Sequence, residues 1–274
     1  MRKSLIALLF LIPASLWAGN ITQPTFNQGV TSIQARITPA GGAYTCSEVQ
    51  LVQLSAYWNL DENTGTNAAD VSTGTHAGTL TNGPQWTPGT CGSGLLFTAA
   101  DSEYVALADD GAGIIGTILA ATQEQFTVTA WVKSTLTTTE TVYSEGNTGS
   151  DTPFIYLKLN DTSEGTIGFG IRDDSSNNGS FITADINVND GAWHHVAIVQ
   201  TATNAREIFM DGASQGTNAT SVDFSAGQLN VANIGRFERT GVTQYFDGTI
   251  DQVRVYAGRA LSEANIDELV AEGK

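Results

Sequence analysis

Short apolar runs recur at close spacing from Leu51 onward, and Gly, Asn, Asp and Thr separate them. Many short runs with turn residues between them predict an all-β sandwich or barrel. Within residues 126–132 the Phe, Val, Ala and Val positions alternate with the others and share one face. The clearest expected strands lie at residues 56–60, 94–98, 104–107, 126–133, 154–159, 166–171, 181–186, 193–200, 206–210, 229–234 and 246–256.

Two local signals add detail to this pattern. The pair Asp211 and Gly212 follows a strand-like run and predicts a hairpin, because both central residues of such a turn favour positive φ. A single short amphipathic helix is expected at the end of the chain, with Ser262 as its N-cap. Leu261 and Ile266 have the spacing of a hydrophobic staple around that cap.

Residues 1–18 resemble a secretory signal rather than a part of the fold. Arg2 and Lys3 supply the positive start, residues 5–12 are apolar, and Ala18 is a small residue before the expected cut. The apolar run is shorter than the roughly 20 residues of a membrane span, and no later stretch qualifies. We therefore expect an exported protein, and the short basic signal is typical of bacteria.

Residues 19–50 are polar and mixed, which predicts an N-terminal arm before a single domain at residues 51–274. Cys46 and Cys91 are the two cysteines, and in an oxidising compartment they predict one disulfide. Such a bond would stabilise the fold by about 4 kcal/mol on the chain-entropy account. A catalytic thiol is the alternative, and no neighbouring motif supports it.

The formal net charge is −16, and it becomes −18 (−16 minus 2) once Arg2 and Lys3 are removed. An acidic surface repels phosphate backbones, so nucleic acid is not an expected partner. The acidity is explained either by solubility after export or by attraction of divalent cations.

Five sequence strings occur in the order typical of one family. They are YWNLDE at 57–62, FTVTAWVK at 126–133, GAWHHVA at 191–197, YFDGTIDQVRVY at 245–256 and ALSE at 260–263. Over residues 51–271 the chain resembles laminin-G-like, concanavalin-A-like jelly-roll domains. The resemblance implies two antiparallel sheets packed face to face. It leaves the activity open, since adhesins, surface subunits and glycosidase-associated modules share this fold.

Glucanases of the laminarinase type have the same broad fold and carry a strand with the pattern Glu-x-Asp-x-x-Glu. That pattern is absent here. The adjacent acidic pairs would point to opposite faces of a strand, and retaining hydrolysis needs two carboxyl groups about 5–5.5 Å apart. These pairs are Asp61-Glu62, Asp109-Asp110 and Asp173-Asp174, while Asp267-Glu268 falls in the expected helix. We therefore expect a protein that is not an enzyme.

His194 and His195 raise the question of a metal site or an acid–base role. Neighbours on a strand face opposite ways, so one metal ion cannot easily bind both. The resemblance implies that this string is structural, with Trp193 packed in the core.

Asp251 is the strongest candidate metal ligand. On a regular strand it would share a face with Val253 and Val255, where a carboxylate is costly unless it is paired or bound to a metal. The resemblance to laminarinase-type glucanases implies that Asp251 holds a structural Ca²⁺ ion. Asp61 and Asp101 are weaker candidates, because their segments should lie beside the last strand. The alternative is a carboxylate that caps backbone N–H groups.

Exposed aromatic side chains often stack on sugar rings, but the sequence does not distinguish them from ordinary packing. The aromatic residues outside the core motifs, and the polar loop residues near them, are Trp86, Tyr143, Tyr156, Phe181, Arg172, Asp173 and Asp174. We expect an exported binding or adhesion module that recognises a glycan or a surface protein. The alternatives are a subunit of a pilus-like or larger surface assembly and, with least support, a glycoside hydrolase.

Overall fold

The computed structural model describes residues 54–72, 75–108, 113–116, 125–173, 179–222 and 229–273. The expected signal, the expected arm and Cys46 lie outside these residues. The described residues belong to one compact unit, Cys46–Lys274. None of the helices in this part of the chain is long and apolar enough to span a membrane.

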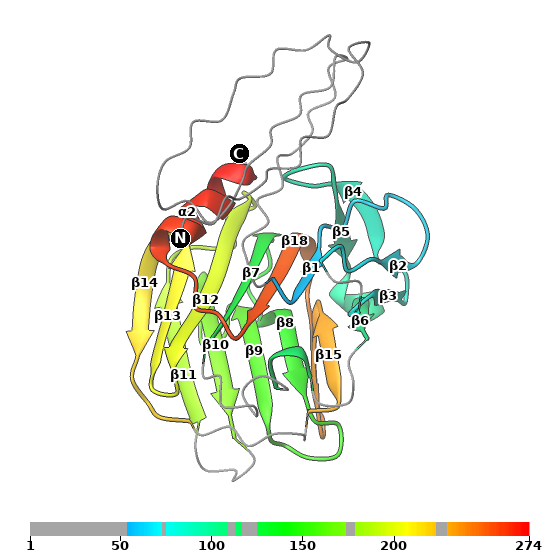
Figure 1. Ribbon diagram of the computed structural model, residues 1–274. Coiled ribbons are helices and arrows are strands. Elements are labelled where there is room, and N and C mark those ends of the chain that lie inside the picture. The colour runs from blue at the N-terminus through cyan, green and yellow to red at the C-terminus, as the bar shows by residue number, and fades with distance from the viewer. Residues whose placement is uncertain are drawn as a thin grey trace, which may run out of the picture. The chain divides into compact units, whose positions relative to one another are not determined.

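Two eight-stranded antiparallel sheets form a sandwich (Figure 1), which confirms the predicted jelly-roll class. The first, sheet A, has the order β14 (Ala213–Asn218), β13 (Ala205–Met210), β12 (His194–Ala202), β7 (Phe126–Lys133), β18 (Gly248–Ala257), β5 (Ser93–Phe97) and β4 (Gln85–Pro88), with β1 (Ala56–Trp58) paired to β18. The second, sheet B, has the order β11 (Gly179–Asp185), β10 (Thr166–Arg172), β9 (Phe154–Leu159), β8 (Glu140–Gly146), β15 (Val231–Ile234), β6 (Tyr104–Leu107), β3 (Gly78–Thr81) and β2 (Asn67–Ala68).

The core lies between the inner faces of the two sheets. The alternation predicted for residues 126–132 is confirmed, because Phe126, Val128, Ala130 and Val132 all belong to this core. Trp131, on the other face of β7, belongs to a separate apolar cluster outside sheet A. Each strand therefore presents an outer face that a further element covers or that stays accessible to a ligand.

The C-terminal helix α2 (Glu263–Glu272) covers part of the outer face of sheet A (Figure 1). Ser262 caps it as predicted, in a reciprocal capping box with Asn265. Leu261 and Ile266 are both buried in the outer cluster, in agreement with the predicted staple.

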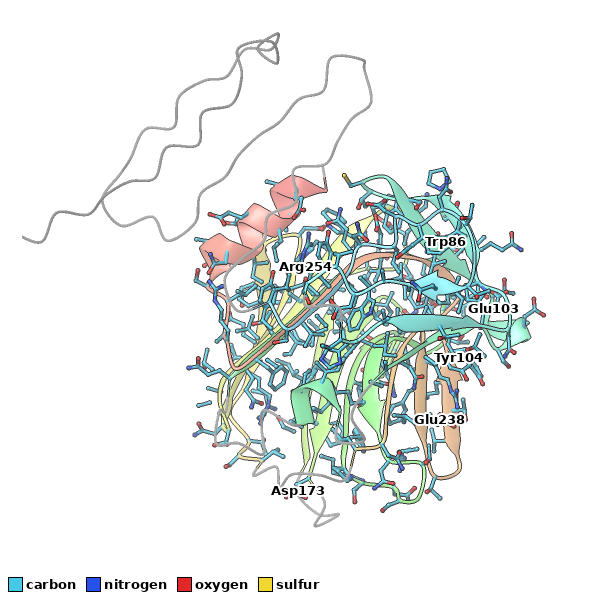
Figure 2. All side chains as sticks on the ribbon, turned by 45° about the vertical axis from the view of Figure 1, so that its right-hand side comes forward. Trp86, Glu103, Tyr104, Asp173, Glu238 and Arg254 are labelled. Atoms are coloured by element: carbon cyan, nitrogen blue, oxygen red, sulfur yellow. The ribbon has the colours of Figure 1, made fainter. Side chains whose placement is uncertain are left out.

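Arg254 anchors the end of this helix from the outer face of β18 (Figure 2). Its guanidinium donates to the Tyr57 hydroxyl and to the Glu272 carboxylate, each at 2.8 Å. All three side chains are at most 1 % exposed. A buried ion pair of this kind needs additional hydrogen bonds, such as the one to Tyr57, to offset the loss of hydration.

A two-stranded hairpin, β16 (Arg236–Arg239) and β17 (Val242–Tyr245), packs against the outer face of sheet B. The Ser144 hydroxyl on β8 donates to the backbone carbonyl of Arg236 at 2.6 Å. A Cβ atom at Gly146 would overlap the carbonyl oxygen of Glu238, so only glycine allows this approach. The hairpin therefore adds a further layer on the outer face of sheet B, next to β9 and β10. A short 3₁₀ helix, η2 (Ala99–Asp101), follows β5.

Candidate ligand pocket and calcium site

A pocket of about 230 Å³ opens on the outer face of sheet B, between β9, β10, β11 and the β16–β17 hairpin. Its lining combines aromatic rings with cationic side chains. The lining residues are Phe154, Tyr156, Lys158, Arg172, Phe181, Phe237, Arg239, Val242 and Gln244.

Four aromatic rings form one contiguous surface in this pocket. Phe154 and Tyr156 stack nearly parallel, with centroids 5.5 Å apart. Phe237 of the hairpin meets each of them edge to face at 5.4 Å. Phe181 lies beside them at 6.4 Å from Phe154 and is 44 % exposed. An aromatic ring this exposed, next to three buried rings, leaves an apolar face available to a ligand.

Two glycines on β10 leave room for this aromatic surface. A Cβ atom at Gly170 would overlap the Tyr156 ring, and one at Gly168 would overlap the Asp161 side chain. The outer face of β10 therefore carries no side chain at these positions. Tyr156 lies across the strand instead, and its hydroxyl donates to Asp161 Oδ2 at 3.3 Å.

Three cations border the rings. The Lys158 ammonium lies 3.7 Å from the centroid of Tyr156. The guanidinium carbons of Arg172 and Arg239 each lie 5.6 Å from the centroid of Phe154. Cation–π attraction holds these three side chains against the rings at the border of the pocket.

The pKa values in the pocket follow from burial. Burial, opposed by Asp161 and assisted by Arg239, lowers the pKa of Lys158 to about 8. Burial also raises the pKa of the Tyr156 hydroxyl and that of Asp161. Arg172 and Arg239 both lower the pKa of Tyr156, so both guanidinium groups are within electrostatic reach of this hydroxyl.

The structure brings together three residues that the sequence offered as ligand candidates, Tyr156, Phe181 and Arg172. Asp173 follows Arg172 at the bottom of the view in Figure 2, whereas Trp86 lies well away at the upper right. Asp174 lies outside the described residues.

The expectation for Tyr143 was wrong. Its ring is fully buried in the core, and its hydroxyl donates to the buried Glu145 at 2.7 Å. It therefore presents no surface to a ligand.

The hairpin residues Phe237 and Arg239 were missed in the sequence. Thr240 and Gly241 at the turn were the available signal, since Gly241 has a φ of +70°. The flanking strands contain Arg, Glu, Gln and Thr, and this polar composition lacks the apolar runs from which the other strands were predicted.

Asp251 is fully buried beside the loop that joins β4 to β5. Its Oδ2 atom accepts hydrogen bonds from the Thr90 N–H and hydroxyl, both at 2.8 Å, and from the Cys91 N–H at 3.3 Å. Its Oδ1 atom is buried and accepts no hydrogen bond from any residue that the structure describes. Burial, reinforced by repulsion from Asp61, raises the pKa of Asp251 to about 7.

The predicted facing of Asp251 was wrong. A β-bulge interrupts β18 between Asp251 and Arg254, with Gln252 at a φ of +48°. Asp251 consequently pairs with Trp131 and lies on the outer face of sheet A, while Val253 and Val255 point into the core.

Asp61 lies near Asp251, on the other side of the same loop. Its Oδ1 atom accepts from the Ser93 N–H at 2.8 Å. Cβ atoms at Gly89 and Gly92 would overlap the carboxylate oxygens of Asp251 and Asp61 respectively, so the loop backbone lies directly against both acids. Asp101 is not part of this arrangement: it is exposed in η2, beyond the far end of β5.

These residues fit a hard cation. Ca²⁺ takes six to eight oxygen ligands, many of them backbone carbonyls. The buried Oδ1 atom of Asp251 and the nearby carboxylate of Asp61 are the side-chain oxygens that would hold it. Within the described ranges no three His, Cys, Asp or Glu side chains group as a metal site, so such an ion would depend largely on backbone oxygens.

His194 bridges two carboxylates. Its Nδ1 atom lies 2.8 Å from Asp211, and its Nε2 atom lies 3.1 Å from Asp190. His195 is buried against Trp131, with ring centroids 5.4 Å apart. The two imidazoles therefore point apart, as their positions on a strand require. The placement of Trp193 in the core was wrong, because it is half-buried at the outer cluster.

Cys91 precedes β5, in the loop that contacts Asp251. Cys46 lies outside the described residues, so the pairing of the two cysteines stays a prediction.

No curated protein matches the chain. Domain 4 of AbnA, an extracellular arabinanase from Geobacillus stearothermophilus in complex with arabinotriose, has a similar structure. It is 18% identical at a TM-score of 0.60, over 80% of this chain and 98% of that chain. The binding domain of botulinum neurotoxin DC in complex with rat synaptotagmin II is 12% identical at a TM-score of 0.62, over 81% of this chain and 52% of that chain. The binding domain of Paraclostridial Mosquitocidal Protein 1 is 13% identical at a TM-score of 0.60, over 80% of this chain and 52% of that chain.

The chain thus spans about half the length of the two toxin structures, and at these identities the likeness shows the fold alone. A family model described as the concanavalin A-like lectin/glucanases superfamily matches residues 99–267, which is more than half of the chain. The chain belongs to this superfamily.

Proposed function

We propose that the protein is an exported, non-catalytic binding module that holds a glycan in the pocket over β9, β10 and the β16–β17 hairpin. The observation that carries the proposal is the exposed Phe181 ring beside the buried rings of Phe154 and Tyr156. Sugar rings present apolar C–H faces that pack on such surfaces. The polar groups around the rings then fix the orientation of the sugar.

The size of the pocket supports recognition of one sugar unit. Its volume of about 230 Å³ is below the roughly 300–1,000 Å³ of pockets that enclose a drug-sized ligand. The buried Oε1 atom of Gln244 accepts no hydrogen bond from the described residues, so a sugar hydroxyl can donate to it. A longer glycan would extend from the open side, past Phe181.

The composition of the pocket supports binding without hydrolysis. No carboxylate is among the residues that line it in the described part of the chain. Hydrolysis with retention needs two carboxyl groups about 5–5.5 Å apart. Asp161 contacts the Tyr156 hydroxyl, but it is a single acid and does not line the pocket.

The relatives support a binding role at the level of the fold. The AbnA domain has the same fold and was solved in complex with arabinotriose, so this architecture can hold a sugar chain. Both toxin structures are described as binding domains, and one of them is in complex with a protein, rat synaptotagmin II.

A structural Ca²⁺ ion at Asp251 and Asp61 is the second part of the proposal. It would neutralise a buried carboxylate and hold the loop at Gly89 and Gly92 against sheet A. The pocket lies on the outer face of sheet B, across the sandwich. The ion would therefore stabilise the domain and not contact the ligand.

A glycan array followed by titration calorimetry tests the binding role. Phe181→Ala should weaken binding of the best array ligand about tenfold, which corresponds to about 1.4 kcal/mol for the loss of one stacking ring. Leu96→Ala is the matched control, because Leu96 is 39 % exposed on β5, outside the pocket. An array without any bound glycan would reject the proposal and favour a protein partner. Equal affinity of Phe181→Ala and the wild type would reject this pocket.

A further inference from the structure

The pocket concentrates positive charge in an acidic protein. The chain has 12 Lys and Arg residues against 28 Asp and Glu residues. Three of those cations, Lys158, Arg172 and Arg239, line one small pocket. Such clustering in a protein of net charge −16 gives this surface a potential opposite to that of the whole molecule.

Among the three cations, Arg172 has donors that are available to a ligand. Its guanidinium lies over the rings of Phe154 and Phe181, at 5.6 and 5.8 Å from their centroids. It makes no hydrogen bond or ion pair with any residue that the structure describes, and its Nε atom is buried. A buried N–H donor without an acceptor costs stability, and the Nε of Arg172 is such a donor among the described residues. An acceptor from outside the chain would satisfy it and could also bind the other N–H groups of the guanidinium.

The carboxylates around the pocket do not neutralise it. Arg239 pairs with Asp151 at 3.0 Å, and that aspartate is largely exposed. Asp161 accepts a hydrogen bond from the Tyr156 hydroxyl and acts electrostatically on Lys158. Arg172 forms no ion pair with a residue that the structure describes, and it lies next to the exposed Phe181 ring.

We infer that the pocket recognises an acidic sugar, one whose ring carries a carboxylate or a sulfate. The inference rests on the proposed glycan-binding function and names the class of glycan. The apolar face of the sugar would lie on Phe181 while its anionic group accepts hydrogen bonds from Arg172. Arginine suits this task because its planar fork can donate two parallel hydrogen bonds to either anion.

Charge also explains why a glycan would need this arrangement. An acidic polymer is repelled by a protein of net charge −16, so only a local group of cations can capture it. Binding should therefore weaken as salt rises, because exposed charges are screened over a Debye length of about 8 Å at physiological ionic strength.

Matched ligands that differ only in charge provide the test. Trigalacturonic acid is compared with its methyl ester, and a sulfated galactose trisaccharide with its unsulfated form, by calorimetry on the full-length exported protein. We expect one acidic member to bind at least tenfold more tightly than its neutral partner. The pair that shows the difference identifies the carboxylate or the sulfate.

Arg172→Gln should weaken that acidic ligand by about 10- to 100-fold and abolish the difference within the pair. Gln keeps part of the side-chain stem over Phe154, and an unchanged melting temperature shows that the variant is folded. Lys133→Gln, which removes an exposed cation outside the pocket, should retain both affinity and preference.

Two results would overturn the inference while leaving the binding function intact. One is neutral trisaccharides that bind as tightly as the acidic ones and are weakened by Phe181→Ala. The other is an acidic ligand whose affinity Arg172→Gln does not change. If neither charged nor neutral glycans bind, in this set or on the array, the proposed function itself fails.

Discussion

The charge on Asp251 is the feature of the fold most open to a quantitative test. Burial raises its pKa from 3.8 to about 7. Each pKa unit corresponds to about 1.4 kcal/mol. The difference of about 3 units means that the ionised carboxylate costs the metal-free folded state on the order of 4 kcal/mol. The uncompensated atom is Oδ1, because Oδ2 accepts three hydrogen bonds.

The sign of the pH dependence follows from this raised pKa. Between about pH 4 and pH 7 the folded state keeps a proton on Asp251 that the unfolded state has lost. The contribution of Asp251 to the free energy of unfolding therefore falls as the pH rises through this window, if no metal is bound. A bound Ca²⁺ ion offsets the loss, so stabilisation by calcium should be small near pH 4 and largest above pH 7.

Thermal melts at pH 8 in calcium and in chelator measure the effect. At a hundredfold excess over Kd the ion adds about 2.7 kcal/mol. For a domain of this size that raises the Tm by about 5–11 °C, at 2–4 °C per kcal/mol. Asp251→Asn removes the charge and should abolish the calcium response, while Asp101→Asn, at an exposed acid away from the loop, should retain it.

Asp251→Ala separates the metal from the backbone cap. It also removes the acceptor for the N–H groups of Thr90 and Cys91. The free energy of unfolding should therefore fall by a further amount of about 1–3 kcal/mol. If the carboxylate acts only as a cap, wild-type protein will melt at the same temperature in calcium and in chelator. That result would refute the metal site.

Three further predictions follow from the sequence and the structure. Cys46 and Cys91 should be bonded in exported protein, and two free thiols by intact mass after alkylation would disprove it. The purified protein should release no reducing sugar from laminarin, lichenan, agar or carrageenan; turnover that a single Asp or Glu substitution abolishes would contradict this. His194 has a raised pKa, chiefly because of its hydrogen bond to Asp211. Its stabilising contribution should be present below pH 6.5 and lost as the pH rises through the raised pKa, a slope absent in His194→Gln.

The fold was largely predictable because its core strands alternate regularly. The run at 126–133 and the cap at Ser262 appear in the structure where the sequence placed them. The strand β8 (Glu140–Gly146) was missed. Its Glu140 and Glu145 are buried polar side chains satisfied by distant partners, and such partners are invisible to a pattern of alternation.

The site was less predictable, for two physical reasons. A bulge changes the face that a residue occupies without a strong local signal, and this is why Asp251 was placed on the wrong side of β18. The pocket combines β9, β10, β11 and a hairpin more than fifty residues further on. Tyr156, Phe181 and Arg172 were identifiable one by one, but only the register of sheet B places them around one cavity.

The central claim is the location of the glycan, and a crystal structure of the complex with the tightest array ligand tests it most directly. We predict a sugar ring packed on Phe181 at the mouth of the pocket, with its anionic group within hydrogen-bond distance of Arg172. A ligand bound at the loop beside Asp251, or on any surface away from the β16–β17 hairpin, would contradict the account.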